Sequence, residues 1–162
     1  MQTLMRATRS APDSGEPLPS PFPILGQLGV LHRRGQLSVV AAGSGVGKSQ
    51  YATYFAVHSR PKIPTLYFSC DTDIATLAAR VGAGCVGARV HDVEAAIRDG
   101  NQDVIAQIEE ATDHIWFAWD NQPSLFDIQN EVEAYALAVG DWPHLIVVDN
   151  LINVDNEGSG GH

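Results

Sequence analysis

The sequence predicts an α/β protein, in which a mostly parallel β-sheet is flanked by helices, over a chain of 162 residues. Short segments rich in β-branched and aromatic residues alternate with longer segments whose apolar residues recur every three or four positions. This alternation is typical of parallel strands that are joined by helices. Hydrophobic residues make up 44% of the chain, which is enough for the core of one domain.

Proline is concentrated near the start of the chain, where five of the nine prolines lie between residues 12 and 23. We therefore expect residues 1–21 to form a flexible or extended arm. The ordered core is expected over residues 22–155. Residues 156–162 are rich in glycine and serine and are expected to form a flexible tail or the start of a loop.

Four segments have the composition of strands, and five have the pattern of helices. The expected strands are 36–42, 65–69, 114–119 and 145–148. The first is apolar on both faces and lies between Gly35 and Gly43, as a buried central strand would. The expected helices are 47–58, 74–81, 93–98, 102–111 and 125–139. Asp71 or Thr72 is expected near the cap of the second helix, and a glycine-rich connection over 82–87 after it.

The clearest motif is Ala-Gly-Ser-Gly-Val-Gly-Lys-Ser over residues 42–49, between an expected strand and an expected helix. It matches the phosphate-binding loop of nucleotide-binding proteins, with Ala42 in place of the first glycine. Glycines let the backbone N–H groups converge on phosphate oxygens, and the helix N-terminus adds partial positive charge. Lys48 can reach the β- and γ-phosphates and is expected to act in catalysis by stabilising the charge that develops there during hydrolysis. The Ser49 hydroxyl can ligate Mg²⁺. The residues expected to bind ATP are Gly43, Ser44, Gly45, Val46, Gly47, Lys48, Ser49 and Gln50.

Asp149 ends the apolar segment that begins at Leu145. Ligands bind at the carboxyl ends of the strands in an open parallel sheet, so Asp149 is expected near Ser49, where it can hold Mg²⁺ directly or through water. The alternative is that Asp149 only caps the following turn.

Hydrolysis also requires a group that orients water opposite the γ-phosphate. Asn150 follows Asp149, so no second acid stands beside the metal carboxylate. Asp71 follows the strand over 65–69 and is one candidate, and Asp73 is another. Capping of the next helix is the alternative role for both.

Three further segments carry a family resemblance: Arg34-Gly35-Gln36-Leu37, Phe68-Ser69-Cys70-Asp71, and Arg80. With the phosphate-binding loop, they resemble the RecA-like ATPase core of DnaB-type replicative helicases, and also RepA-type hexameric ATPases and KaiC-like proteins. The resemblance spans about residues 25–154. It implies that Lys48 and Ser49 bind nucleotide and Mg²⁺, that Asp71 is the catalytic base, and that Asp149 assists the metal. The family usually has Glu at the position of Asp71, and the role of Arg80 stays open.

The resemblance also implies partners. Such cores act on DNA as rings or filaments of like subunits, and their DNA-binding loops, sensor residue and arginine finger follow the strand of Asp149. We therefore expect a truncated core, an oligomer of this chain, and contact with single-stranded DNA through loops beyond residue 162. The expected function is ATP hydrolysis in a DnaB-like helicase of DNA replication. A RecA-like recombination ATPase and a nucleotide-binding assembly module with little hydrolysis remain alternatives.

The charge is unevenly distributed along the chain. Residues 1–64 hold seven Lys/Arg and two Asp/Glu, whereas residues 65–162 hold three and 17, so that +5 and −14 give the net −9. No apolar run reaches the ~18 residues of a membrane span, and no secretory signal is visible. The two cysteines form no disulfide framework or zinc knuckle, so a cytoplasmic setting is expected. The aromatic residues of 116–119 are expected in the core rather than stacked on bases.

Overall fold

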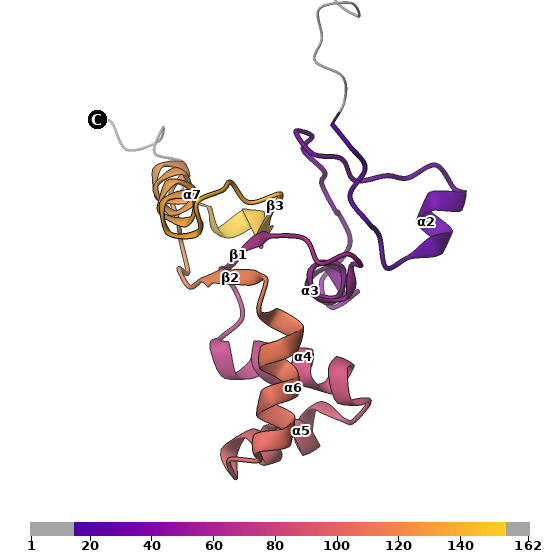
Figure 1. Ribbon diagram of the computed structural model, residues 1–162, viewed down its shortest axis with the longest axis vertical. Helices are drawn as coiled ribbons and strands as arrows, with labels where there is room; N and C mark the ends of the chain where they lie inside the picture. The colour runs from indigo at the N-terminus through magenta and orange to yellow at the C-terminus, as the bar shows by residue number, and fades with distance from the viewer. Residues whose placement is uncertain (1–14, 155–162) are drawn as a thin grey trace, which may run out of the picture.

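The computed structural model describes residues 15–154 as helices and a small parallel sheet (Figure 1). The helices are α2 (Pro23–Gln27), α3 (Lys48–His58), α4 (Ile74–Val86), α5 (Val90–Arg98), α6 (Gln102–Thr112) and α7 (Leu125–Val139). The strands are β1 (Thr65–Ser69), β2 (Ile115–Ala118) and β3 (Leu145–Asp149), and a 3₁₀ turn follows at Leu151–Asn153. The α/β class is confirmed, as are the strand over 65–69 and the helix over 125–139 with their bounds.

The sheet has the order β2-β1-β3, with both pairs parallel. The central strand β1 is buried along its whole length. Its register places Tyr67 beside Phe117 and Val147, and Ser69 beside Asp149. The carboxyl ends of the three strands therefore meet at one edge, where Asp149 lies.

Helices cover both faces of the sheet (Figure 1). On one face, Leu66 and Phe68 of β1 pack with Tyr135 of α7. On the other face, Tyr67 packs with Ala56 and Val57 of α3 and with Leu77 and Val81 of α4. Helices α4, α5 and α6 lie together at one end of the molecule. This alternation along β1 follows from the two-residue period of a strand.

The expected central strand over 36–42 is wrong. These residues form no strand, and Leu37 is 92% exposed. An apolar run becomes a strand only where a neighbouring strand pairs with its backbone, and within residues 15–154 the second edge of β3 has no strand beside it.

The glycine-rich connection expected over 82–87 is also wrong for most of its length, because α4 continues through Val86. Gly82 is buried in the contact of α4 with Val93 of α5 and Ile108 of α6. The absence of a side chain there allows the helices to approach closely. Helix α4 ends at Gly87, whose φ of +66° suits glycine.

Of the proline-rich arm expected over 1–21, the structure describes residues 15–21. Pro17 forms a bridge with Arg33, and Leu18 packs with Phe55 and Ile63. Phe22, the first residue after the expected arm, stacks on Tyr51 with ring centroids 5.0 Å apart. This part of the arm therefore contributes to the core. The rest of the arm, and the tail expected over 156–162, lie outside the described residues.

Candidate functional site

Residues 42–47, the expected phosphate-binding loop, lead directly into α3. Gly45 and Gly47 have φ of +74° and +104°, a conformation that is costly for other residues. Gly47 is the N-cap of α3, and no side chain caps the helix. The first-turn N–H groups are thus available to an anion, and the helix dipole favours negative charge at this end.

The Lys48 side chain folds back over the loop. Its ammonium donates hydrogen bonds to the carbonyl oxygens of Ala42 and Gly43, each over 3.0 Å. The loop residues from Gly43 to Gly47 are exposed, while Lys48 and Ser49 are half-buried. The positive charge of Lys48 therefore lies beside the exposed loop, where phosphate oxygens could take the place of the two carbonyl oxygens as its hydrogen-bond acceptors.

Ser49 and Asp149 are brought together from positions 100 residues apart. The Ser49 hydroxyl donates to Oδ1 of Asp149 over 2.9 Å. Ser49 lies in the first turn of α3, and Asp149 ends β3. A hydroxyl and a carboxylate at this spacing are the oxygen donors that Mg²⁺ accepts beside substrate phosphates, so the residues present fit that ion. The Asp149 side chain does not cap the following turn, which was the alternative role, because its carboxylate accepts hydrogen bonds from Ser49 and Tyr67.

Two further hydroxyl groups, those of Tyr67 and Thr53, are hydrogen-bonded in series to Asp149, and the sequence did not predict them. The Tyr67 hydroxyl donates to Oδ2 of Asp149 over 3.0 Å and lies 3.1 Å from Oγ1 of Thr53. Burial, followed by the nearby Asp149 carboxylate, raises the pKa of Tyr67 well above its usual range, so the phenol keeps its proton. One signal was available: Thr53 is four residues after Ser49, on the same face of α3.

The two candidate water-orienting acids have different environments. Asp73 is the N-cap of α4 and accepts hydrogen bonds from the backbone N–H (3.0 Å) and hydroxyl (2.7 Å) of Thr76. These bonds lower the pKa of Asp73. Asp73 thus has the capping role, which the sequence left open as its alternative, whereas the expected cap at Asp71 or Thr72 is wrong. Asp71 is exposed and, within residues 15–154, makes no hydrogen bond to the phosphate-binding loop.

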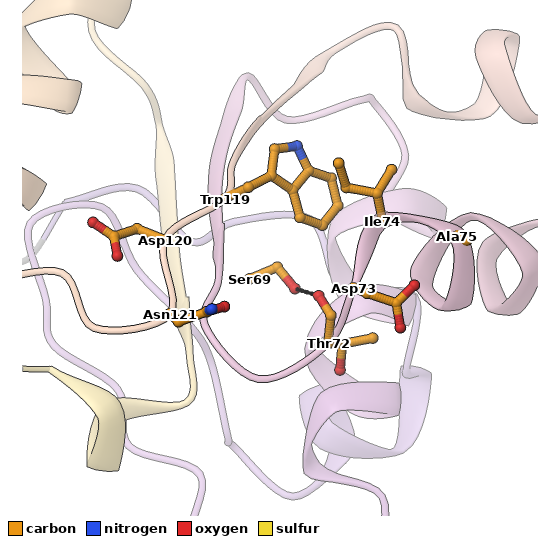
Figure 2. A pocket seen from close by; sticks show the side chains of 8 residues that line it. All are labelled: Ser69, Thr72, Asp73, Ile74, Ala75, Trp119, Asp120 and Asn121. Atoms are coloured by element: carbon orange, nitrogen blue, oxygen red, sulfur yellow. Dashed lines mark hydrogen bonds between the residues drawn. The ribbon is translucent and has the colours of Figure 1, made fainter.

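A cavity of about 560 Å³ opens at the same sheet edge, between the loops that follow β1 and β2 (Figure 2). Its lining residues are Ser69, Thr72, Asp73, Ile74, Ala75, Trp119, Asp120 and Asn121. Asp71 lines a neighbouring, more polar cavity of about 800 Å³ with Cys70, Asp120 and Asn153. Asp71 therefore faces open space from which water can approach, on the edge that also carries Asp149.

The structure also shows the surroundings of Cys70, of the aromatic residues of 116–119 and of Arg80, which the sequence raised as possible functional residues. The Cys70 thiol is buried, and its burial, with Asp120 and Asp149 nearby, raises its pKa, which disfavours a reactive thiolate. The expectation of core packing holds only partly for the aromatic residues of 116–119, because Trp116 and Trp119 are more than two-fifths exposed. Arg80 lies exposed on α4.

No cluster of three or more His, Cys, Asp or Glu side chains that could hold a metal occurs within residues 15–154. The Ser49–Asp149 pair is not such a cluster, since it offers two protein oxygens, and an ion held there would need further ligands such as phosphate oxygens. In the same part of the chain, none of the helices has the length and apolar character needed to cross a membrane.

Comparison with known proteins gives two phage relatives. The chain is 40% identical over 150 residues to the gene 65 protein of Mycobacterium phage L5, an alignment covering 91% of this chain and 54% of that protein. It is 38% identical over 125 residues to the gene 65 protein of Mycobacterium phage D29, covering 76% of this chain and 52% of that protein. No family model matches the chain. The chain thus spans about half the length of the curated relatives that it matches, and it is similar to proteins encoded by mycobacteriophages.

Proposed function

We propose that this chain is the ATP-binding and ATP-hydrolysing part of a P-loop NTPase with a RecA-like core, acting as a DnaB-like DNA helicase in replication. The observation that supports it best is the 2.9 Å hydrogen bond between Ser49 and Asp149. It joins the last residue of the phosphate-binding motif to the acid at the end of a parallel strand, the pair that nucleotide-bound Mg²⁺ requires.

In this proposal, the loop amides and the N-terminus of α3 hold the phosphates of ATP. Lys48 exchanges its bonds to Ala42 and Gly43 for bonds to phosphate oxygens. Ser49 and Asp149 hold Mg²⁺, which when bound neutralises charge on the β- and γ-phosphates. Asp71 orients the water that attacks the γ-phosphorus, the bond to the bridging oxygen breaks, and ADP and phosphate leave.

The DNA-binding and oligomeric parts of the proposal rest on the resemblance to DnaB-type helicases. Single-stranded DNA is the proposed partner, and a ring or filament of this chain is the proposed assembly. The relatives come from bacteriophages, in line with a replication protein of such a genome. A RecA-like recombination ATPase would use the same site residues, and DNA unwinding distinguishes the two.

A nucleotide-binding assembly module with little hydrolysis is the second candidate, favoured by the position of Asp71. Asp is one methylene shorter than the Glu of the resembled family, and within the described chain Asp71 is exposed and makes no hydrogen bond to the phosphate-binding loop. Such a protein would bind ATP tightly and release little phosphate.

The test compares Lys48→Ala with Lys62→Ala. Lys62 is a suitable control because its ammonium binds Asp113 (2.7 Å) and the Glu110 carbonyl, away from the loop. We expect ATP turnover, measured with and without single-stranded DNA, to fall about 100-fold or more in Lys48→Ala and to stay unchanged in Lys62→Ala. Equal turnover in Lys48→Ala and the unmodified protein contradicts the proposal. Tight binding of ATP without turnover in the unmodified protein supports the assembly module instead.

A further inference from the structure

A series of buried hydroxyl groups leads to the second oxygen of the Asp149 carboxylate, the one that Ser49 does not bind. Tyr67 is 0% exposed, and Thr53 and Asp149 are 7% and 8% exposed. The Tyr67 hydroxyl lies 3.1 Å from Thr53 Oγ1 and 3.0 Å from Asp149 Oδ2. Each carboxylate oxygen thus has its own donor, since Ser49 binds Oδ1.

The chemistry of these groups determines which member donates in each hydrogen bond of the series. An ionised carboxylate only accepts hydrogen bonds, so Tyr67 donates to Asp149. The Tyr67 oxygen can then accept from Thr53. The result is a directed series, Thr53 to Tyr67 to Asp149, in which every proton has an acceptor. Hydrogen bonds to an ionised group in a poorly solvated place are the stronger ones.

Tyr67 is also the most deeply buried member of the series. It lies in the central strand, which is paired on both sides, and its ring packs 5.6 Å from that of Phe117. Ala56 and Val57 of α3 pack against the same cluster. Ser49, by contrast, lies half-buried in the first turn of α3, beside the exposed loop. The packing around Tyr67 therefore holds its hydroxyl beside the Asp149 carboxylate.

We propose that Tyr67 is a positioning residue for the metal site: its hydroxyl holds Oδ2 of Asp149 so that Oδ1 stays directed at Ser49. This inference rests on the proposed nucleotide and Mg²⁺ binding and adds a determinant of metal affinity to it. Groups that orient metal ligands typically change metal affinity 10- to 100-fold when removed. A Phe at this position would fill the same space in the core but leave Oδ2 without its donor.

The test uses Tyr67→Phe, with Tyr135→Phe as the matched control. Tyr135 is also buried, but it lies on the opposite face of the sheet, against Trp116. Mn²⁺ binding to the ADP-bound protein is measured by electron paramagnetic resonance, and ADP binding is measured separately in EDTA. We expect about tenfold weaker Mn²⁺ binding in Tyr67→Phe. ADP binding in EDTA should be unchanged in both variants, and Mn²⁺ binding unchanged in Tyr135→Phe.

The outcomes separate this inference from the proposed function. If the unmodified protein binds ADP and Mn²⁺ and Tyr67→Phe binds Mn²⁺ equally well, Tyr67 has only a packing role. This result overturns the inference and leaves the proposed function intact. If the unmodified protein binds no nucleotide, the proposed function fails, and the metal role of Tyr67 fails with it.

A second pair of variants applies if Tyr67→Phe does not fold. In the proposed series, the hydrogen bond from Thr53 fixes the direction of the Tyr67 hydroxyl toward Oδ2 of Asp149. Thr53→Val removes this bond and should release Oδ2, whereas Thr53→Ser keeps it. We expect Thr53→Val to weaken Mn²⁺ binding and Thr53→Ser to restore it toward that of the unmodified protein. Equal Mn²⁺ affinity in the two variants overturns the inference.

Discussion

Gly82 of α4 lies directly against Val93 of α5: a Cβ atom on Gly82 would come within 2.7 Å of Val93 Cγ1. It would also lie 2.8 Å from Cδ1 of Ile108 in α6. Val93 is buried and β-branched, so it has little freedom to turn away. The three helices at this end of the molecule are therefore packed around a position that excludes a methyl group.

The first prediction concerns Gly82→Ala. Overpacking typically costs about 1–3 kcal/mol, whereas replacing glycine in a helix gains up to about 1 kcal/mol. The steric cost exceeds the gain, so we expect the free energy of unfolding to fall by about 1–2 kcal/mol, as measured by urea denaturation. Gly84→Ala is the control, because its nearest neighbour would be His58 Nε2 at an ordinary 3.5 Å. That variant should be as stable as the original protein or slightly more so.

The second prediction separates capping from catalysis at Asp73 and Asp71. Asp73→Ala removes both hydrogen bonds to Thr76 and should lower the melting temperature by a few degrees. Asp71→Ala should leave the melting temperature unchanged and lower ATP turnover, because Asp71 is exposed and caps no helix. Loss of stability in Asp71→Ala with normal turnover would reverse these assignments.

The third prediction is that the arm residue Leu18 stabilises the fold. Leu18 is 9% exposed and packs with Phe55 and Ile63, so Leu18→Ala should lower the free energy of unfolding by about 2 kcal/mol. Leu28→Ala provides the comparison, since Leu28 is 69% exposed and should change stability by less than about 0.5 kcal/mol. Equal effects of the two substitutions in thermal or urea denaturation would show that the arm does not contribute to the core.

The fourth prediction is a decrease in stability on mild acidification, caused in part by His32. Its ring nitrogens lie 2.7 Å from the Tyr51 hydroxyl and 3.0 Å from Ser38 Oγ. Burial lowers the pKa of His32, so the unfolded chain takes up its proton at a higher pH than the folded chain. The contribution of neutral His32 is present above the usual pKa of about 6.5 and is lost as the pH falls from there through the lowered value.

Urea midpoints measured between pH 8 and pH 5 test this prediction. His32→Gln should flatten the dependence only in part, because burial, followed by the charge of Arg60, also lowers the pKa of His58. His91→Gln is the control, since His91 is exposed. An unchanged slope in His32→Gln would contradict the assignment.

Elements whose periodicity and end residues both lie in their own segment of the sequence could be predicted. Helix α7 has apolar residues at helical spacing and a capping box between Ser124 and Asp127, and its bounds were predicted correctly. The segment over 36–42 shows the limit of such signals. Its apolar composition favours a strand, but a strand also depends on a partner, and composition does not identify partners. In α4, glycines that indicate a loop by propensity instead allow close helix contact.

Part of the candidate site could likewise be predicted from the sequence, and part could not. The phosphate-binding motif and the strand-ending acid predicted that Ser49 and Asp149 would meet, because parallel strands end at one edge. Tyr67 could not be assigned in advance. Alternation along the strand gives the face on which its side chain lies, but its contact with Asp149 depends on the register of β1 and β3, which long-range packing determines.

The 100-residue separation of Ser49 and Asp149 has a consequence for folding. Contacts between distant segments form late, because the entropy of closing the intervening chain must be overcome first. Ser49 can reach Asp149 only after β3 has joined β1. In the proposed function, a nucleotide with Mg²⁺ would therefore bind selectively to the assembled sheet. A substitution that keeps β3 from docking would then abolish metal binding even with the loop sequence intact.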